Sequence, residues 1–191
     1  MAELLLQSIR EKVSATDEEL LICKSFFTPK KLKKKQFLLQ EGDVCNRMTF
    51  VESGALFSYS TSAKGTQNVI QVAFEGWWIS DLYSFFTQEP STLNIEVLED
   101  AELLMIDREQ HEHLLARVPK YETYIRLLYQ NAYIALQRRV ESTLGLTAEE
   151  KYVRLLEQYP TILQRMPLHL VASYLGVTPE TLSRIRKQIS L

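Results

Sequence analysis

The chain has 191 residues, of which 46% are hydrophobic and 24% charged, and its formal net charge is −2. This composition is ordinary for a soluble globular protein with one large domain or two small ones. No apolar run approaches the roughly 20 residues of a membrane-spanning helix, and the N-terminus is unlike a signal peptide. We therefore expect a cytoplasmic protein that has no membrane partner.

Cysteine and histidine content argues against a metal site and against an enzyme. Cys23 and Cys45 are too few for a disulfide framework or a four-cysteine cluster. His111 and His113 point to different faces of a predicted helix, and His169 stands alone. A catalytic site of either kind would require histidines and carboxylates that converge in the fold. We expect no catalytic residue, no metal and no resident cofactor.

The first 28 residues form a predicted helical region, in which Thr16-Asp17-Glu18-Glu19 is a capping box. A run of lysines then spans residues 30–35, interrupted by Leu32. The run could contact phosphates, but a run alone fixes no geometry. We favour the alternative, a solvated start of a strand.

Short apolar runs separated by turn residues extend from Phe37 to about Asp107. This pattern predicts a closed or sandwiched antiparallel sheet. The expected strands are residues 37–40, 48–51, 55–61, 68–74, 93–99 and 101–107. An aromatic-rich segment, 77–91, interrupts the strand rhythm, which is where a ligand pocket can be built.

Asp107 can cap the next helix, and a long helix follows from Lys120 to about Leu144. Apolar residues recur along it at alternating spacings of four and three, the period of a coiled-coil seam. The helix could pack against its own β domain, form a homodimer seam, or do both on different faces. We favour a homodimer seam, which contains Ile125, Leu128, Ala132 and Ala135.

Gly145 ends this helix, and Thr147-Ala148-Glu149-Glu150 is a second capping box. The sequence thus predicts a sensor domain at 1–118, a dimerisation helix at 119–145 and a C-terminal domain at 146–191. From residue 147 onward there are six Lys and Arg against four Asp and Glu, a net of +2 that leaves −4 for the remainder. A basic unit on an acidic body suits a DNA reader with a separate regulatory part.

The stretch LHLVASYLGVTPETLSRIRK, 168–187, predicts two short helices around a tight corner. Gly176 can take the left-handed conformation that ends the first helix. Thr178 can cap the second helix, and Pro179 suits its first position. The apolar residues and small Ala172 are expected to face inward; they are Leu168, Val171, Leu175, Val177, Leu182 and Ile185.

The outer face of the second helix carries hydrogen-bonding groups suited to base edges and phosphates. This pattern resembles the DNA-binding helix-turn-helix, whose second helix lies in the major groove. An ordinary helical hairpin with a solvated polar face is the bland alternative. A second alternative is a small-molecule-binding signalling module whose helix-turn-helix serves only for packing.

The order of these parts resembles the Crp/Fnr family of bacterial transcription regulators over nearly the whole chain. The motifs that carry the resemblance are Glu41-Gly42-Asp43, Gly54, the insert from Gly76 to Val97, and Gly176 to Arg184. The resemblance implies an α+β fold with an N-terminal antiparallel β-roll, which is a double-stranded β-helix of the cyclic-nucleotide-binding type. A long dimerisation helix and an all-α helix-turn-helix domain would follow. The segment 159–166 is too short for a β-hairpin wing.

The resemblance places a ligand pocket at Gly76, Ser80, Asp81, Leu82, Ser91 and Thr92. In cyclic-nucleotide-binding members, a Gly-Glu-Leu motif binds the ribose and an Arg-Ser pair binds the cyclic phosphate. Here Ser80-Asp81-Leu82 and Ser91-Thr92 stand in their places, without the arginine. The lost charge-assisted bonds are worth about 1.5–3 kcal/mol each. We expect that cyclic AMP is not the natural ligand. An iron–sulfur cluster, which another branch of the family uses, is not expected either, because the chain lacks the cysteine cluster that would bind it.

The resemblance also assigns base contacts to Glu180 and Arg184. Supporting or phosphate contacts fall on Thr178, Thr181, Ser183 and Lys187. Pro179 stands where some relatives have a base-reading arginine, so a different sequence preference is expected. The implied partners are double-stranded DNA with a palindromic operator, a second copy of the chain, RNA polymerase and a small-molecule effector.

Overall fold

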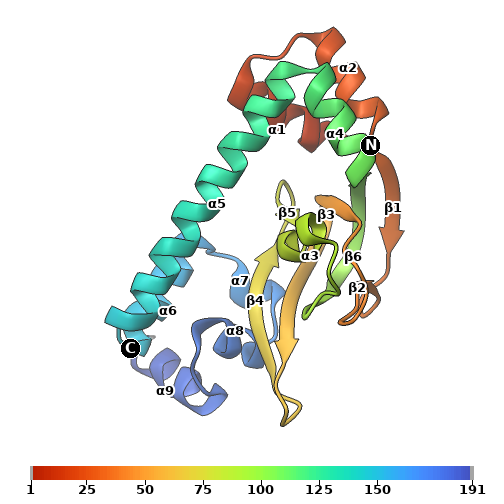
Figure 1. Ribbon diagram of the computed structural model, residues 1–191. Coiled ribbons are helices and arrows are strands. Elements are labelled where there is room, and N and C mark those ends of the chain that lie inside the picture. The colour runs from red at the N-terminus through yellow and green to blue at the C-terminus, as the bar shows by residue number, and fades with distance from the viewer. Residues whose placement is uncertain (1, 190–191) are drawn as a thin grey trace. The chain divides into compact units, whose positions relative to one another are not determined.

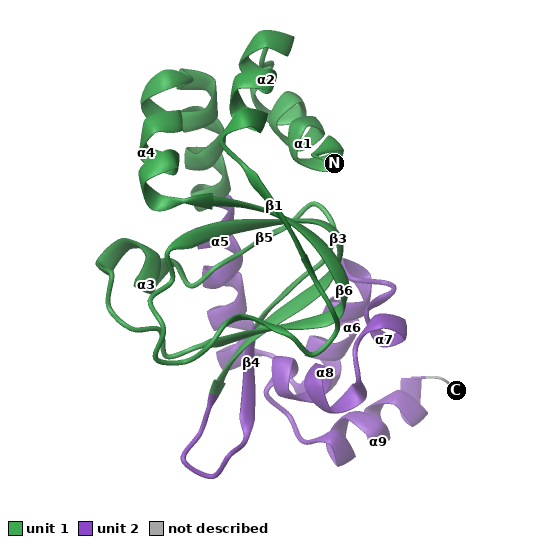
Figure 2. Ribbon diagram, turned by 90° about the vertical axis from the view of Figure 1, so that its right-hand side faces the viewer, with its two compact units in different colours: residues 1–60, 71–130 green, residues 61–70, 131–191 purple. Residues whose placement is uncertain are grey.

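The computed structural model describes residues 2–189, which divide into two compact units (Figure 1, Figure 2). Within the described residues, unit 1 comprises residues 2–60 and 71–130, and unit 2 comprises residues 61–70 and 131–189. This division differs from the three predicted segments in two ways. The boundary between the units lies inside the long helix, and the hairpin segment 61–70 is grouped with the C-terminal helices in unit 2. Met1, Ser190 and Leu191, which the predicted segments include, lie outside the described residues.

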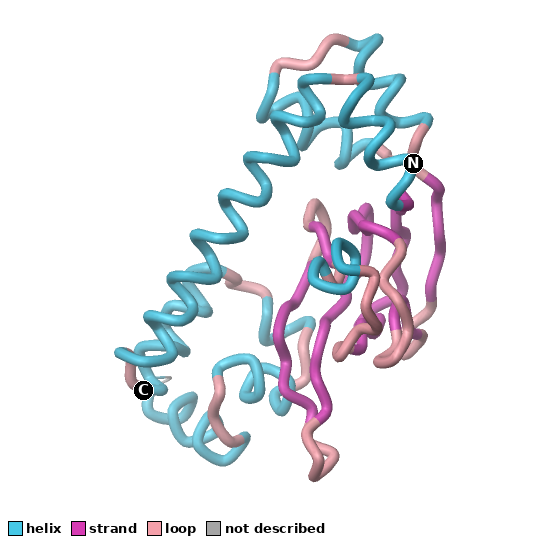
Figure 3. Tube along the Cα trace, in the orientation of Figure 1, coloured by secondary structure: helices cyan, strands magenta, loops and turns pink. Residues whose placement is uncertain are grey.

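The strands all lie between Thr28 and Asp107, with one short helix among them (Figure 3). They are β1 (Thr28–Leu32), β2 (Phe37–Leu39), β3 (Arg47–Thr61), β4 (Gln67–Ala73), β5 (Trp78–Ile79) and β6 (Asn94–Asp107). The helices before β6 are α1 (Glu3–Val13), α2 (Asp17–Ser25) and α3 (Leu82–Thr87). Those after it are α4 (Arg108–Arg117), α5 (Pro119–Gly145), α6 (Ala148–Gln158), α7 (Ile162–Arg165), α8 (Leu168–Leu175) and α9 (Pro179–Ile189).

One sheet connects the strands in the order β1-β6-β3-β4, with β2 also paired to β6 and β5 to β3. The pairings of β6 with β1, β2 and β3, and of β3 with β5, are antiparallel. The expected α+β fold with an antiparallel sheet is thereby confirmed. In the lysine run, Lys31 pairs with Glu102 and Lys33 Nζ lies 2.8 Å from Asp100 Oδ2. These exposed contacts fit the start of a solvated strand.

Two strands are longer than the sequence indicated. Residues 48–51 and 55–61 belong to one continuous strand, β3, and β6 likewise continues through Asp100. Gly54 has φ +87°, and a Cβ there would lie 2.3 Å from the backbone oxygen of Asp100. The pairing of β3 with β6 shifts register around Gly54. The glycine therefore accommodates a β-bulge at a close backbone approach, where the sequence pattern had indicated a turn.

Helix ends follow the local sequence closely. Thr16 and Thr147 form the two predicted capping boxes with Glu19 and Glu150. The carboxylate of Asp107 accepts a hydrogen bond from the Gln110 amide at 2.9 Å and caps α4. These predictions are confirmed. They could be made from the sequence because a cap depends on side chains only three residues apart.

Each unit has its own apolar core. In unit 1 the helices and the sheet share a core around the fully buried Phe50, Leu103 and Tyr121. The buried Tyr124 hydroxyl pairs with Ser8 Oγ at 2.9 Å and accepts from Trp78 Nε1 at 3.1 Å. The core of unit 2 includes Tyr152, Leu155, Ile162, Met166, Leu170, Val171, Leu175, Leu182 and Ile185. Among the described residues, no helix is both long enough and apolar enough to cross a membrane.

Candidate nucleic-acid interface and ligand region

The corner between α8 and α9 has the geometry that the sequence predicts. Gly176 lies in the left-handed region at φ +72°, and its amide donates to the Ser173 carbonyl at 3.0 Å. The Val177 amide closes the turn on the Ala172 carbonyl at 3.0 Å. Leu182 and Ile185 of α9 are buried against the rest of unit 2. Of the expected inward positions, Leu168 and Val177 are only half-buried, and Leu170 is buried in addition.

The predicted DNA-contacting residues lie along α9 and at its cap. Thr178, Pro179, Glu180, Arg184 and Lys187 are exposed, whereas Thr181 and Ser183 are half-buried. Thr178 Oγ1 accepts from the Thr181 amide at 3.2 Å, so this hydroxyl has a structural role as the cap of α9. Their contacts with DNA stay a prediction.

Helix α9 carries more basic than acidic side chains, which suits contact with a polyanion. The helix carries Arg184, Arg186 and Lys187 against the single acid Glu180. A hydrogen bond from its own backbone amide, followed by one from the Thr178 hydroxyl, lowers the pKa of Glu180. Glu180 is therefore ionised at neutral pH, which suits it to accept a hydrogen bond from a cytosine amino group.

Helix α5 presents two different faces. The predicted seam residues Ile125 and Leu128 lie against the core of unit 1, with Ile125 buried and Leu128 half-buried. Ala132 and Ala135 are exposed. The predicted seam therefore begins on the face that the helix uses for packing within its own chain, as the intramolecular alternative expected. Its role in a dimer stays a prediction.

A second apolar stripe on α5 escaped the sequence analysis. Tyr133, Leu136, Val140 and Leu144 have exposed fractions of 69%, 59%, 51% and 83%. Their spacings of three, four and four place them on one face, roughly 100° around the helix from the predicted seam at 3.6 residues per turn. Contiguous exposed apolar side chains of this kind mark an interaction surface. The same three–four spacing was present in the sequence as a signal.

Two residues of the predicted ligand pocket, Asp81 and Ser91, are bonded to each other. Asp81 is buried, and its carboxylate accepts from Ser91 Oγ at 2.7 Å and from the Ser84 amide at 3.2 Å. The second bond caps α3. Asp81 and Ser91 stand at the positions that the resemblance assigns to ribose and phosphate recognition, and here each satisfies the other.

The remaining pocket positions also have local partners or face outward. Ser80 Oγ accepts from the Thr49 amide at 3.1 Å, and the Gly76 amide donates to the Val51 carbonyl at 2.8 Å. Leu82 is half-buried and Thr92 is exposed. That these six residues form a ligand pocket stays a prediction.

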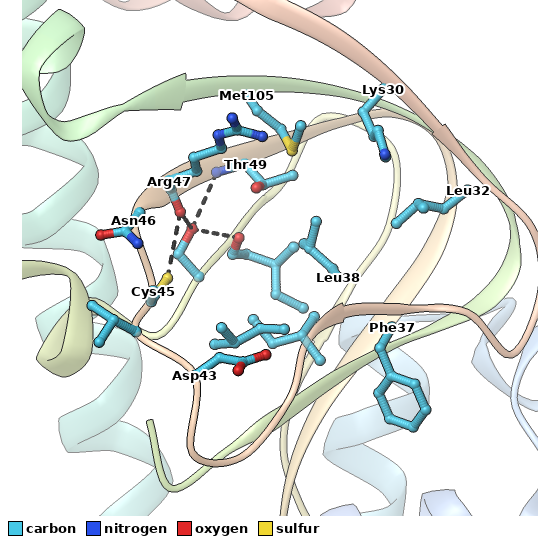
Figure 4. A pocket seen from close by; sticks show the side chains of 15 residues that line it. Lys30, Leu32, Phe37, Leu38, Asp43, Cys45, Asn46, Arg47, Thr49 and Met105 are labelled. Carbon is cyan, nitrogen blue, oxygen red and sulfur yellow. Dashed lines mark hydrogen bonds between the residues drawn. The ribbon is translucent and has the colours of Figure 1, made fainter. Parts of the chain in front are cut away.

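A cavity of about 580 Å³ in unit 1 lies elsewhere (Figure 4). Ser80 is its one lining residue from the predicted set, and Leu32, Leu38 and Ile95 contribute apolar wall. Lys30, Arg47 and Asp43 add charges of both signs. The volume falls in the range of small-molecule sites. Its walls come from strands far apart in sequence, so no local pattern could have revealed it.

Burial shifts the pKa values of two titratable side chains in unit 1, Cys45 and His111. Cys45 lines the cavity, and burial raises the pKa of its thiol, so the thiol is protonated at neutral pH and a poor nucleophile. Burial also lowers the pKa of His111, whose Nδ1 lies 3.4 Å from the Tyr121 hydroxyl. Within residues 2–189, no group of three or more His, Cys, Asp and Glu could hold a metal ion.

Comparison with known proteins adds a domain family and a fold. Residues 29–118 match the cyclic nucleotide-binding domain family. The global regulator CLP of Xanthomonas campestris, described as c-di-GMP responsive, has a similar structure with a TM-score of 0.73 at 14% identity, covering 92% of each chain. FixK2 of Bradyrhizobium japonicum gives 0.73 at 19% identity, covering 86% of this chain and 84% of its own. The catabolite activator protein of Thermus thermophilus gives 0.54 at 20% identity over 96% and 86%. Among curated proteins, no sequence matches this chain significantly.

Proposed function

We propose that this chain, which carries a cyclic nucleotide-binding domain at residues 29–118 and has the fold of the Crp/Fnr regulators, is a homodimeric transcription regulator that reads DNA with α9. One observation carries the proposal: α9 turns its apolar side into the core of unit 2 and leaves Glu180, Arg184 and Lys187 exposed along one polar surface. A helix presented in this way can enter a major groove.

Dimerisation follows from the same requirement. Two recognition helices read half-sites about 34 Å apart only if a two-fold assembly holds them. The exposed stripe of Tyr133, Leu136, Val140 and Leu144 supplies an apolar surface on α5 that a second copy can cover. A regulator of this type would also contact RNA polymerase and respond to a small-molecule effector.

A salt-dependent mobility-shift assay tests the DNA-reading function. It compares random duplexes with a pool of inverted repeats at low and physiological ionic strength. A regulator binds random duplexes weakly with steep salt dependence and some repeats more tightly. A signalling module that uses the helix-turn-helix only for packing would bind neither pool at low ionic strength.

Cyclic AMP is not the effector in this proposal. The 2.7 Å bond between Asp81 and Ser91 would have to break, and a phosphate would meet a carboxylate without an arginine to balance it. We expect the melting temperature of the protein to stay unchanged in millimolar cyclic AMP. A ligand present at one hundred times its Kd would add about 2.7 kcal/mol of stability. A saturable rise in melting temperature would contradict the expectation.

A further inference from the structure

The hairpin between β3 and β4 belongs to unit 2, the unit of the C-terminal helices (Figure 2). Local bonds close its turn: the Ser62 amide donates to the Thr66 carbonyl at 3.0 Å, and the Gly65 amide donates to the Ser62 carbonyl at 2.8 Å. β4 is the last strand in the path of the sheet. The hairpin therefore presents backbone groups of an edge strand to its surroundings.

Ser173 of α8 satisfies two of these edge groups with one hydroxyl. Its Oγ donates to the Gln67 carbonyl at 2.7 Å and accepts from the Val69 amide at 2.9 Å. A serine hydroxyl can do both, because it has one hydrogen to donate and lone pairs to accept with. Ser173 thus takes the place of a partner strand at this edge and fastens α8 to the hairpin.

Arg139 of α5 makes further contacts with the same hairpin. Its Nη2 donates to the Val69 carbonyl at 3.1 Å, and its Nη1 donates to the Ile70 carbonyl. The guanidinium also lies over the ring of Tyr174, 4.6 Å from the ring centroid. One arginine therefore contacts the hairpin and α8 together, while its backbone belongs to α5. We call Ser173 and Arg139, with the hairpin residues 67–70, the clamp.

We propose that the clamp fixes the orientation of α9 relative to α5, so that Ser173 and Arg139 are positioning residues that set the spacing between the two DNA half-sites. The inference rests on the proposed DNA-reading dimer. α5 carries the apolar stripe for the second copy, and α8 carries α9 through the tight corner at Gly176. Arg139 on α5 and Ser173 on α8 both bond to the hairpin, and these bonds limit the rotation of α9 relative to α5. Neither side chain lies among the residues expected to touch DNA.

The test is a spacing profile. Wild-type protein is titrated with inverted repeats whose spacer is shortened or lengthened one base pair at a time, and with a single half-site. We expect wild type to lose roughly tenfold in affinity for each base pair away from the best spacer. Ser173→Ala and Arg139→Ala should bind the best spacer roughly three- to tenfold more weakly and tolerate other spacers better. For Ser173→Ala the affinity for the single half-site should stay unchanged, whereas Arg139→Ala should lose there only the uniform amount that removing one positive charge costs.

Two controls separate positioning from folding and from charge. Ser173→Thr keeps the hydroxyl and should restore the sharp profile, which a merely structural defect at this site would not do. Arg138→Ala removes the same charge from the neighbouring exposed position of α5, so it should weaken binding to all spacers equally. Unchanged spacing profiles in both Ser173→Ala and Arg139→Ala would overturn the inference.

A distance measurement judges the clamp even if the protein proves not to bind DNA. Spin labels are attached to cysteines introduced at Gln137 of α5 and Gln188 of α9, both exposed, in a chain diluted with unlabelled protein. Cys23 and Cys45 are buried with raised thiol pKa values, about 11 for Cys23, so they resist labelling. We expect a narrow distance distribution in wild type and a broad one in Ser173→Ala and Arg139→Ala. Equal widths would overturn the clamp, whereas failure of wild type to bind any duplex would overturn only the proposed function.

Discussion

We expect the double substitution Leu136→Asp, Val140→Asp to make the protein monomeric and to lower its affinity for an inverted repeat about 100-fold or more. Both side chains are exposed on the α5 stripe, so the change leaves the core of the chain intact. Each buried apolar side chain in a dimer contributes about 1.5–3 kcal/mol, and the aspartates would repel their two-fold mates. Loss of the second half-site removes an avidity factor of about 10² to 10⁴. Sedimentation velocity and a mobility-shift titration measure the two effects.

The matched control is Ile134→Asp on the same helix. Ile134 is 46% exposed and lies on a different face from the stripe, so its replacement introduces one aspartate on the same helix without touching the stripe. We expect it to leave the oligomeric state and the operator affinity as in wild type. A dimer that survives the double substitution would place the interface elsewhere on the chain, and the stripe would have no part in it.

Arg184→Ala is expected to cost about 1–3 kcal/mol per half-site and to relax sequence preference at a single base pair. The Arg184 side chain is exposed on α9, while the neighbouring Leu182 and Ile185 are buried and hold the helix in place. Its guanidinium can donate two parallel hydrogen bonds to guanine, which alanine cannot replace. Competition titrations against operators with single base changes measure the preference at each position.

Lys187→Ala provides the comparison for that result. As a phosphate contact it should weaken all duplexes equally and reduce the slope of affinity against salt by about one for each lysine removed from the interface. A uniform loss in Arg184→Ala, with no change in preference at any position, would assign Arg184 to the backbone of the DNA and leave base reading to another residue.

The sequence was most informative where structure depends on neighbouring residues. The capping boxes at Thr16 and Thr147 and the glycine corner at Gly176 each need only a few consecutive side chains. The corner between α8 and α9 could be predicted for the same reason. The outward side of α9 followed once Leu182 and Ile185 were assigned to the core.

Features that depend on distant residues could not be predicted in this way. Gly54 reads locally as a turn, and only the approach of Asp100 in a partner strand makes it a bulge. The apolar period of α5 fits two faces, and the packing of Ile125 against the rest of unit 1 decides which one is covered within the chain. The bond between Asp81 and Ser91 joins residues that the family resemblance assigns to separate ligand contacts. The clamp at Ser173 joins residues more than one hundred positions apart.

Selection of duplexes from a random pool by the purified full chain tests the central claim most directly. The account predicts enrichment of an inverted repeat whose half-sites are centred about 34 Å apart, with two chains bound to each duplex. A monomeric protein that enriches no sequence and retains no duplex at low ionic strength would contradict it.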